Sequence, residues 1–274
     1  MDERSILFGG ARIVYFIGGS GPAIVFVHGY PMDHTVWEAF VKPLTFNYTV
    51  ILPDNPGFGK STLPEGEMGM DVYADSIKTI LEAEQISSCI MIGHSMGGYI
   101  TLHFAASYPQ VLKGMGLFHS TSREDDESKK EDRRRVADFV RRNGAAPFVK
   151  ELIRKLFSDR YAGSHGMEIK ELIERYSLIQ PEGIARASLA MGKRTDTTAV
   201  LLEVAAPVLF ILGKEDKTIP LQKALQLTHL PRRSLVHILE HVAHMGMLEA
   251  PAETVNTVLE FLELCEVFTV NSSE

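Results

Sequence analysis

The chain has 274 residues, of which 45% are hydrophobic and 23% are charged, as is usual for a globular protein. Its formal net charge of −7 excludes a general nucleic-acid-binding protein, and no apolar run approaches the roughly 18 residues of a membrane span. Its two cysteines, Cys89 and Cys265, are too few for a disulfide scaffold. The charged N-terminus lacks the apolar segment of a signal peptide, so we expect a cytoplasmic protein without membrane insertion or nucleic-acid partners.

The first part of the chain alternates strand-like and helix-like segments. Short apolar or β-branched runs predict strands, and apolar residues spaced by three and four predict helices between them. The strands are expected at residues 5–8, 12–17, 23–27, 48–52, 89–92 and 111–118, and the helices around 37–44, over 71–84 and from 96 to just before 109. This alternation indicates βαβ units and a mostly parallel central sheet flanked by helices.

The alternation stops after residue 118. Thr121-x-x-Glu124 predicts a capping box that opens a highly charged helix, and Gly144 ends that helix. Further helices are expected over residues 148–156 and 169–176 and from 181, before strands resume at 208–212 and 234–239, with helices over 221–230 and from 251. We therefore predict an α/β core of residues 1–118 and 199–274, with an all-helical cap (lid) of residues 119–198 above the strand ends.

Gly93-x-Ser95-x-Gly97 joins an expected buried strand to an expected helix. A strand that turns sharply into a helix strains the backbone of the residue at the turn, and small neighbours let the chain pass without clashes. The Ser95 side chain would then project beside a helix N-terminus, whose free N–H groups stabilise an oxyanion. The pattern also suits a packing turn or a phosphate loop, so Ser95 is a candidate nucleophile that needs further support.

A serine hydroxyl needs a general base, and the base needs a carboxylate that orients it. Asp216 and His244 follow the last two expected strands, so both should lie where the carboxyl ends of the strands meet. Asp216 could instead cap a helix, with Glu215 as its nearest substitute. His241 competes with His244, which we prefer because it lies deeper in the turn, just before Met245 and Gly246.

An oxyanion needs two backbone donors. The N–H of Met96, the residue after the candidate nucleophile, is the first. The second should come from the loop after the strand at residues 23–27, where Pro31 cannot donate and Tyr30 or Gly29 can. We prefer Tyr30.

Five motifs carry a family resemblance. They are His28-Gly29-Tyr30-Pro31, Asp54-x-Pro56-Gly57-x-Gly59-x-Ser61, Gly93-His94-Ser95-Met96-Gly97-Gly98, Gly213-x-x-Asp216 and Ala243-His244-Met245-Gly246. In order and approximate spacing they resemble the motifs of the α/β-hydrolase family, nearest to its serine esterase, lactonase and cofactor-free haloperoxidase-like members. The resemblance implies an α/β-hydrolase fold, a Ser95–His244–Asp216 triad, an acyl-enzyme reaction on a small or medium carboxylic ester, and no metal or cofactor. Ala243 stands where many relatives have glycine.

The same resemblance leaves other activities open. Dehalogenases and epoxide hydrolases of this family carry aspartate at the elbow, so Ser95 favours acyl chemistry. C–C bond hydrolases use the same three groups, and some relatives are receptors or lyases. Family esterases that act on an acidic carrier protein dock through basic residues of the cap. The basic residues here are interleaved with acidic ones, which is more typical of a solvated helix; they are Lys129, Lys130, Arg133, Arg134, Arg135, Arg141 and Arg142.

Overall fold

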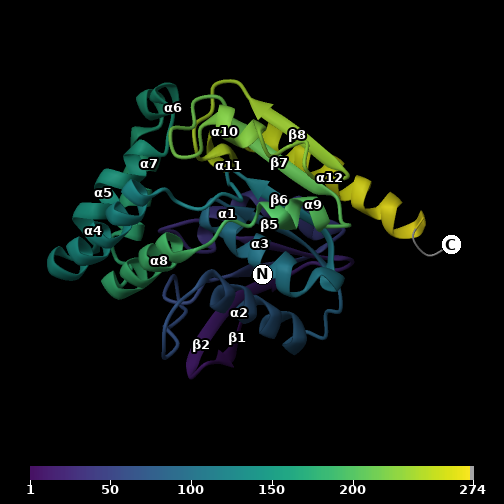
Figure 1. The fold of residues 1–274 in the computed structure, drawn as a ribbon, viewed down its shortest axis with the longest axis horizontal. Coiled ribbons are helices and arrows are strands. Elements are labelled where there is room, and N and C mark those ends of the chain that lie inside the picture. Colours follow the sequence, from purple (N-terminus) through teal and green to yellow (C-terminus); the bar gives the residue numbers. More distant parts are fainter. Residues whose placement is uncertain (272–274) are drawn as a thin grey trace.

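A computed structural model describes residues 1–271, and its eight strands form one sheet in the order β1-β2-β4-β3-β5-β6-β7-β8 (Figure 1). The strands are β1 (Asp2–Phe8), β2 (Ala11–Gly18), β3 (Ala23–Val27), β4 (Thr49–Pro53), β5 (Cys89–His94), β6 (Leu112–Phe118), β7 (Val208–Gly213) and β8 (Ser234–Leu239). Only the β1–β2 and β2–β4 pairs are antiparallel. The predicted α/β fold with a mostly parallel sheet is confirmed.

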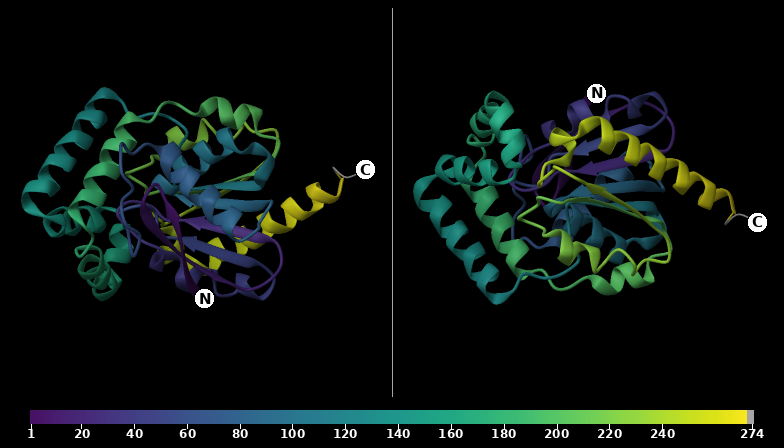
Figure 2. Two further views of the ribbon diagram at one scale, coloured as in Figure 1. Left: turned by 90° about the horizontal axis from the view of Figure 1, so that it is seen from below. Right: turned by 90° about the horizontal axis from the view of Figure 1, so that it is seen from above.

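Helices cover both faces of this sheet. They are α1 (Thr35–Val41), α2 (Met70–Ala83), α3 (Met96–Ser107), α9 (Thr198–Glu203), α10 (Leu221–Leu225), α11 (Gly246–Glu249) and α12 (Pro251–Asn271). Helix α3 contacts α2 and α9 in one layer, and α12 contacts α1 and α11 in the other (Figure 2). No helix among residues 1–271 is both long enough and apolar enough to cross a bilayer.

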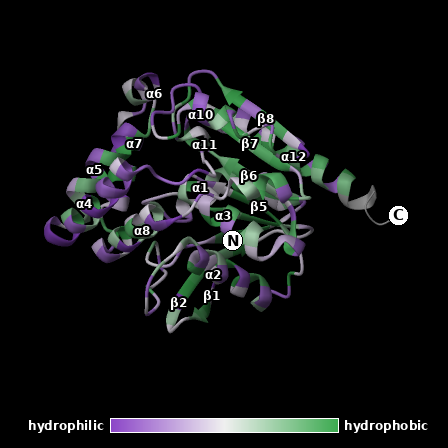
Figure 3. Cartoon of the chain, in the orientation of Figure 1, coloured by the Kyte–Doolittle hydropathy of each residue, from purple (hydrophilic) through white to green (hydrophobic). Residues whose placement is uncertain are grey.

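The central strands form the core of the molecule. All residues of β3, β5 and β7 are buried, and β5 and β7 are largely hydrophobic (Figure 3). Parallel strands covered by helices on both faces have no solvent side, which explains why these segments read as continuous apolar runs rather than alternating ones. Because β3, β5 and β7 are buried and each pairs with a neighbour on both sides, they fix the positions of the residues that follow them.

Five further helices follow β6 and precede β7 in the chain. They are α4 (Glu127–Asn143), α5 (Ala145–Lys155), α6 (Asp159–Ser164), α7 (Gly166–Tyr176) and α8 (Pro181–Lys193). They gather on one side of the molecule, at the left in Figures 1 and 2, with α4 packed on α8 and α5 on α7. The limits of a separate cap unit stay a prediction, but no strand interrupts this helical segment.

The predicted capping box at the start of this segment is wrong. Asp126 caps α4, because its Oδ1 accepts the N–H of Lys129 at 2.9 Å. The Thr121 hydroxyl accepts an N–H two residues further on instead. Asp125 is buried and its Oδ1 lies 2.8 Å from Arg194 Nη2, so residues 121–125 turn inward before the helix begins.

The predicted helix over residues 221–230 is also too long. Helix α10 ends at Leu225, and the chain continues in turns with bonds between residues three apart, such as Leu227 N–H to Ala224 C=O at 3.0 Å. The Thr228 hydroxyl bonds the Leu225 carbonyl at 3.0 Å, which competes with helical hydrogen bonding. Helices α6 and α9, of six residues each, were not predicted, because so few turns give no clear periodicity.

Candidate active site

Ser95 lies at the turn between β5 and α3. Its backbone has φ 51° and ψ −114°, a left-handed conformation that is unusual for a residue with a side chain. A Cβ atom on Gly93 would overlap the Gly97 carbonyl, so only glycine fits beneath this turn. The Ser95 N–H donates to the Phe118 carbonyl at 2.9 Å, and the Ser120 hydroxyl donates to the Ser95 carbonyl at 2.7 Å. The strained turn is thus held from the end of β6.

Asp216 and His244 form a buried pair at the ends of the neighbouring strands β7 and β8. His244 Nδ1 lies 2.8 Å from Asp216 Oδ2. Asp216 Oδ1 accepts the N–H groups of Thr218 and Ile219 at 2.8 and 2.9 Å. Because a carboxylate only accepts hydrogen bonds, Nδ1 carries the proton, and Nε2 of the neutral ring remains free to act as a base.

The environment of Asp216 favours its anion. Burial alone would raise the pKa of this carboxyl, but the charge of His244 and hydrogen bonds from His119 and His244 outweigh burial and hold the pKa well below its ordinary value. An Asp216 that is ionised at neutral pH keeps His244 in one tautomer and stabilises its imidazolium form.

The alternative pair from the sequence is exposed and loose. His241 Nδ1 lies 3.7 Å from Glu215 Oε1, and the two side chains are 65% and 40% exposed. Such a contact at the surface contributes little in water. The geometry therefore distinguishes the two pairs, and the buried one contains Asp216 and His244.

The His244 loop lies directly on the elbow. His94, which precedes Ser95, approaches the His244 carbonyl with its Nε2 at 2.9 Å, and the centroids of the two rings are 4.9 Å apart. Within residues 1–271 the partly exposed Ser95 hydroxyl makes no hydrogen bond to His244. Nucleophile–base contacts are often long before substrate binds.

The predicted oxyanion donors are unoccupied. Met96 is the first residue of α3, and Tyr30 follows β3; in the described part of the chain neither amide N–H has a hydrogen-bond partner. The Tyr30 ring packs near Phe58 and Phe148, at centroid distances of 6.2 and 5.9 Å. Its hydroxyl donates to the Ile184 carbonyl at 3.3 Å, so Tyr30 also joins the core to α8.

His119 was assigned no role from the sequence, yet it contacts the acid. Its Nδ1 lies 3.1 Å from Asp216 Oδ2. His119, Asp216 and His244 each offer an atom that can bind a metal ion, and these three atoms lie within 4.8 Å of one another. Both imidazole–carboxylate distances are those of hydrogen bonds, which already commit both Nδ1 atoms. The missed signal was a polar residue directly after a buried strand.

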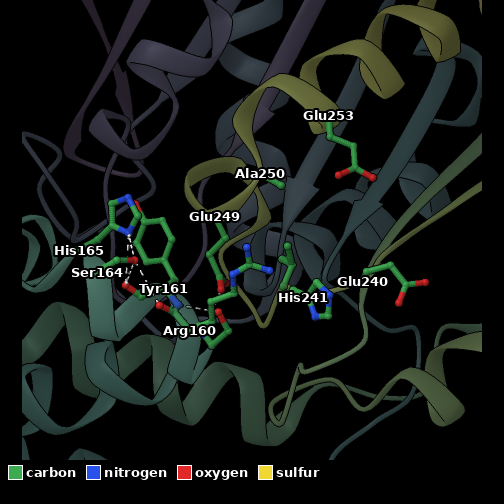
Figure 4. A pocket seen from close by; sticks show the side chains of 11 residues that line it. Arg160, Tyr161, Ser164, His165, Glu240, His241, Glu249, Ala250 and Glu253 are labelled. Atoms are coloured by element: carbon green, nitrogen blue, oxygen red, sulfur yellow. Dashed lines mark hydrogen bonds between the residues drawn. The ribbon is translucent and has the colours of Figure 1, made fainter.

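Glu249 of α11 anchors the loop that carries His244. Its Oε1 accepts the N–H groups of Ala243 and Met245, each at 3.1 Å, and its Oε2 accepts the N–H of Ser158 at 3.0 Å. A cavity of about 440 Å³, into which several polar side chains extend, lies here between α6 and residues 240–253 (Figure 4). One carboxylate therefore joins the His244 loop to the helical segment.

A family model for the alpha/beta hydrolase fold matches residues 22–251. A thermophilic esterase from Thermogutta terrifontis, solved with malate bound, is 28% identical, covers 97% of this chain and 99% of its own, and superposes with a TM-score of 0.92. A 2-hydroxymuconate semialdehyde hydrolase from a Pseudomonas species is 29% identical over 94% of this chain and 93% of its own. Pyrrolizixenacetamide deacetylase from Xenorhabdus hominickii is 25% identical over 94% and 97%. With its elbow, strand order and family match, the chain belongs to the α/β-hydrolase fold family.

Proposed function

We propose that this protein is a serine hydrolase that cleaves a small or medium carboxylic ester. The observation that carries the proposal is the buried His244–Asp216 hydrogen bond of 2.8 Å, on a loop that touches the strained elbow at Ser95. A base oriented by a carboxylate beside a serine at a helix N-terminus is the arrangement that acyl transfer requires.

The reaction proceeds in two stages. Ser95 Oγ attacks the ester carbonyl while His244 Nε2 takes its proton, and the N–H groups of Met96 and Tyr30 stabilise the tetrahedral oxyanion. His244 then gives the proton to the departing alcohol, which leaves an acyl group on Ser95. Water, activated by His244, attacks this acyl-enzyme, releasing the acid and restoring the serine.

The relatives support a hydrolase but differ in substrate. The Thermogutta protein is an esterase. The similarity to the Pseudomonas semialdehyde hydrolase makes C–C bond hydrolysis the second candidate function for this chain. An arginine beside Ser95 would favour the C–C alternative, because a cation would bind an acidic substrate such as the dienoic acid named for one relative. Arg194, a buried arginine, has its guanidinium 4.0 Å from the centroid of the Tyr99 ring on α3. Its Nη1 and Nη2 bond Asp125 and two carbonyl groups, and within residues 1–271 only its Nε lacks a hydrogen-bond partner. These contacts occupy it structurally, so we favour the ester.

The test is hydrolysis of p-nitrophenyl esters of increasing acyl length by the wild type and by Ser95→Ala. We expect turnover by the wild type and a loss of about 10³-fold or more in the variant. A fluorophosphonate should label the wild type on Ser95 and leave the variant unlabelled. A Ser95→Ala protein as active as the wild type would refute the proposal, and selective turnover of a ring-cleavage product would favour the C–C alternative.

A further inference from the structure

Two imidazole rings share one oxygen of Asp216. His244 Nδ1 lies 2.8 Å and His119 Nδ1 lies 3.1 Å from the same Oδ2 atom. Since the carboxylate can only accept, both rings donate through Nδ1. His244 lies over the elbow, whereas His119 approaches Asp216 from the end of β6.

The His119 ring occupies a narrow slot between two glycines. A Cβ atom on Gly213 would lie 2.9 Å from its Cε1, and one on Gly246 would lie 2.6 Å from its Nε2. The ring is fully buried, and within residues 1–271 Nε2 has no hydrogen-bond partner. An apolar side chain would fill the slot without leaving a buried nitrogen unpaired. The bond to Asp216 is what a histidine adds.

The backbone at His119 is also held in a defined conformation. His119 has φ 49°, a left-handed backbone conformation that is uncommon for a residue with a side chain. The residue before it accepts the Ser95 N–H, and the residue after it donates to the Ser95 carbonyl. Residues 118–120 therefore contact both the candidate nucleophile and the candidate acid.

We propose that His119 is a positioning residue of the active site, which fixes the Asp216 carboxylate through a second hydrogen bond to Oδ2. This inference rests on the proposed function. His119 does not touch substrate and acts through Asp216. Its hydrogen bond keeps the carboxylate from rotating out of the orientation in which it accepts the His244 Nδ1–H.

The charged and titratable groups around His119 explain why it serves as a fixed donor. Asp216, His244, His94 and Glu249 face it from four segments. Burial lowers the pKa of His119, and its bond to Asp216 only partly opposes this effect. The ring stays neutral at neutral pH while it withdraws part of the Asp216 charge from His244. Without this donor, Asp216 would stabilise the His244 imidazolium more strongly.

The test compares His119→Leu, which removes the donor, with His119→Asn, whose amide nitrogen can replace Nδ1. In His119→Leu we expect kcat for a p-nitrophenyl ester to fall about 10- to 100-fold. We also expect the acid limb of the kcat/KM profile to move to higher pH by roughly 0.5–1 unit. His119→Asn should restore the limb and most of kcat. An unchanged limb in a folded His119→Leu protein, or equal defects in both variants, would overturn the proposal, because a packing role would not depend on the donor.

A second measurement needs neither activity nor a folded Leu variant. In the wild type labelled with 15N-histidine, NMR should report His119 as the Nδ1–H tautomer at neutral pH, with the signal assigned by its loss in His119→Asn. An Nε2–H tautomer would overturn the proposal. An inactive wild type with an Nδ1–H His119 would instead count against the proposed function alone.

Discussion

Asp216 accepts hydrogen bonds on both carboxylate oxygens, from two backbone N–H groups on Oδ1 and from two imidazoles on Oδ2. All these partners are donors, and the pKa of the carboxyl is lowered accordingly. An amide cannot replace this carboxylate, since its NH₂ group would face two donors whichever way it turned. The site thus requires a side chain at position 216 that accepts hydrogen bonds on both oxygens, and not only one with the shape of aspartate.

Asp216→Asn should therefore reduce kcat for a p-nitrophenyl ester by about 10³- to 10⁴-fold, because His244 loses its orienting acceptor. Glu215→Gln, at the adjacent and exposed position, is the matched control and should retain wild-type kcat. The opposite ranking of these two variants would assign the acid to Glu215.

At the scale of elements, Glu249 connects α11 with the His244 loop and the start of α6. Glu249→Ala leaves three backbone N–H groups without an acceptor, so we expect the loop to lose its fixed position and kcat to fall by roughly tenfold or more. Glu253→Ala is the control. The Glu253 carboxylate lines the same cavity and, in the described residues, pairs only with His237, so its loss should change kcat little. Equal kcat in both variants would contradict this role for Glu249.

Helix α8 touches the core through two glycines. A Cβ atom on Gly183 would overlap the Gly57 carbonyl oxygen, so Gly183→Ala must push α8 away from the loop that follows β4. We expect the free energy of unfolding to fall by about 1–3 kcal/mol from overpacking, more than the helix gains from alanine. Urea titration of both variants measures this change. Gly163→Ala in α6, where an added Cβ atom meets no atom within 4 Å, is the control and should be neutral or stabilising. A Gly183→Ala protein as stable as the wild type would show that α8 adjusts freely.

At the scale of the whole molecule, the buried histidines make stability depend on pH. Burial lowers the pKa of His28, His94 and His119 below its usual value near 6.5. Below that pH the unfolded chain binds protons that the native protein does not, so native stability is lost as pH falls from about 6.5 toward the lower folded values.

Each of these histidines should cost up to about 1.4 kcal/mol per pH unit in that range. Urea unfolding at pH 7, 6 and 5 should therefore give a falling midpoint, with a shallower fall in His119→Asn, which removes one of the three groups. A midpoint that is constant from pH 7 to 5 would contradict the expectation.

The sequence was most informative where burial is complete. The limits of β3 were predicted to the residue and those of β5 and β7 within two, because uninterrupted apolar runs bounded by turn residues mark strands well. The limits of β8 were also predicted to the residue, although only Leu239 of this strand is buried. Ser95 was identifiable since it directly follows β5, and Asp216 and His244 since each lies in the loop after a predicted strand. The start of α4 was mispredicted: Asp126 caps the helix, and the preceding Asp125 turns inward to an ion pair with Arg194, a residue distant in the sequence.

His119 and Glu249 could not be assigned from the sequence, because their partners depend on which strands are neighbours. His119 meets Asp216 only because β6 pairs with β7, and Glu249 folds back onto a loop that precedes it.

The seven basic residues of α4 all have an acidic partner within 4.0 Å. These pairs weaken the positive field that docking of an acidic carrier protein would need, and such docking stays a prediction.

The pairing of β6 with β7 has a consequence for how relatives of this protein diverge. The chain leaves the sheet after Phe118 and returns at Val208 on the adjacent strand, where Met115 pairs with Val208 and Phe118 with Ile211. The helical segment itself begins and ends at one place, because the Thr197 N–H donates to the Ser122 carbonyl at 2.9 Å. A segment whose two ends lie side by side can be lengthened, shortened or replaced by recombination without breaking the sheet. Helix α9 alone can supply the crossover that two parallel neighbours require. Selection can therefore exchange the entire helical segment while the reacting groups at the strand ends are inherited unaltered.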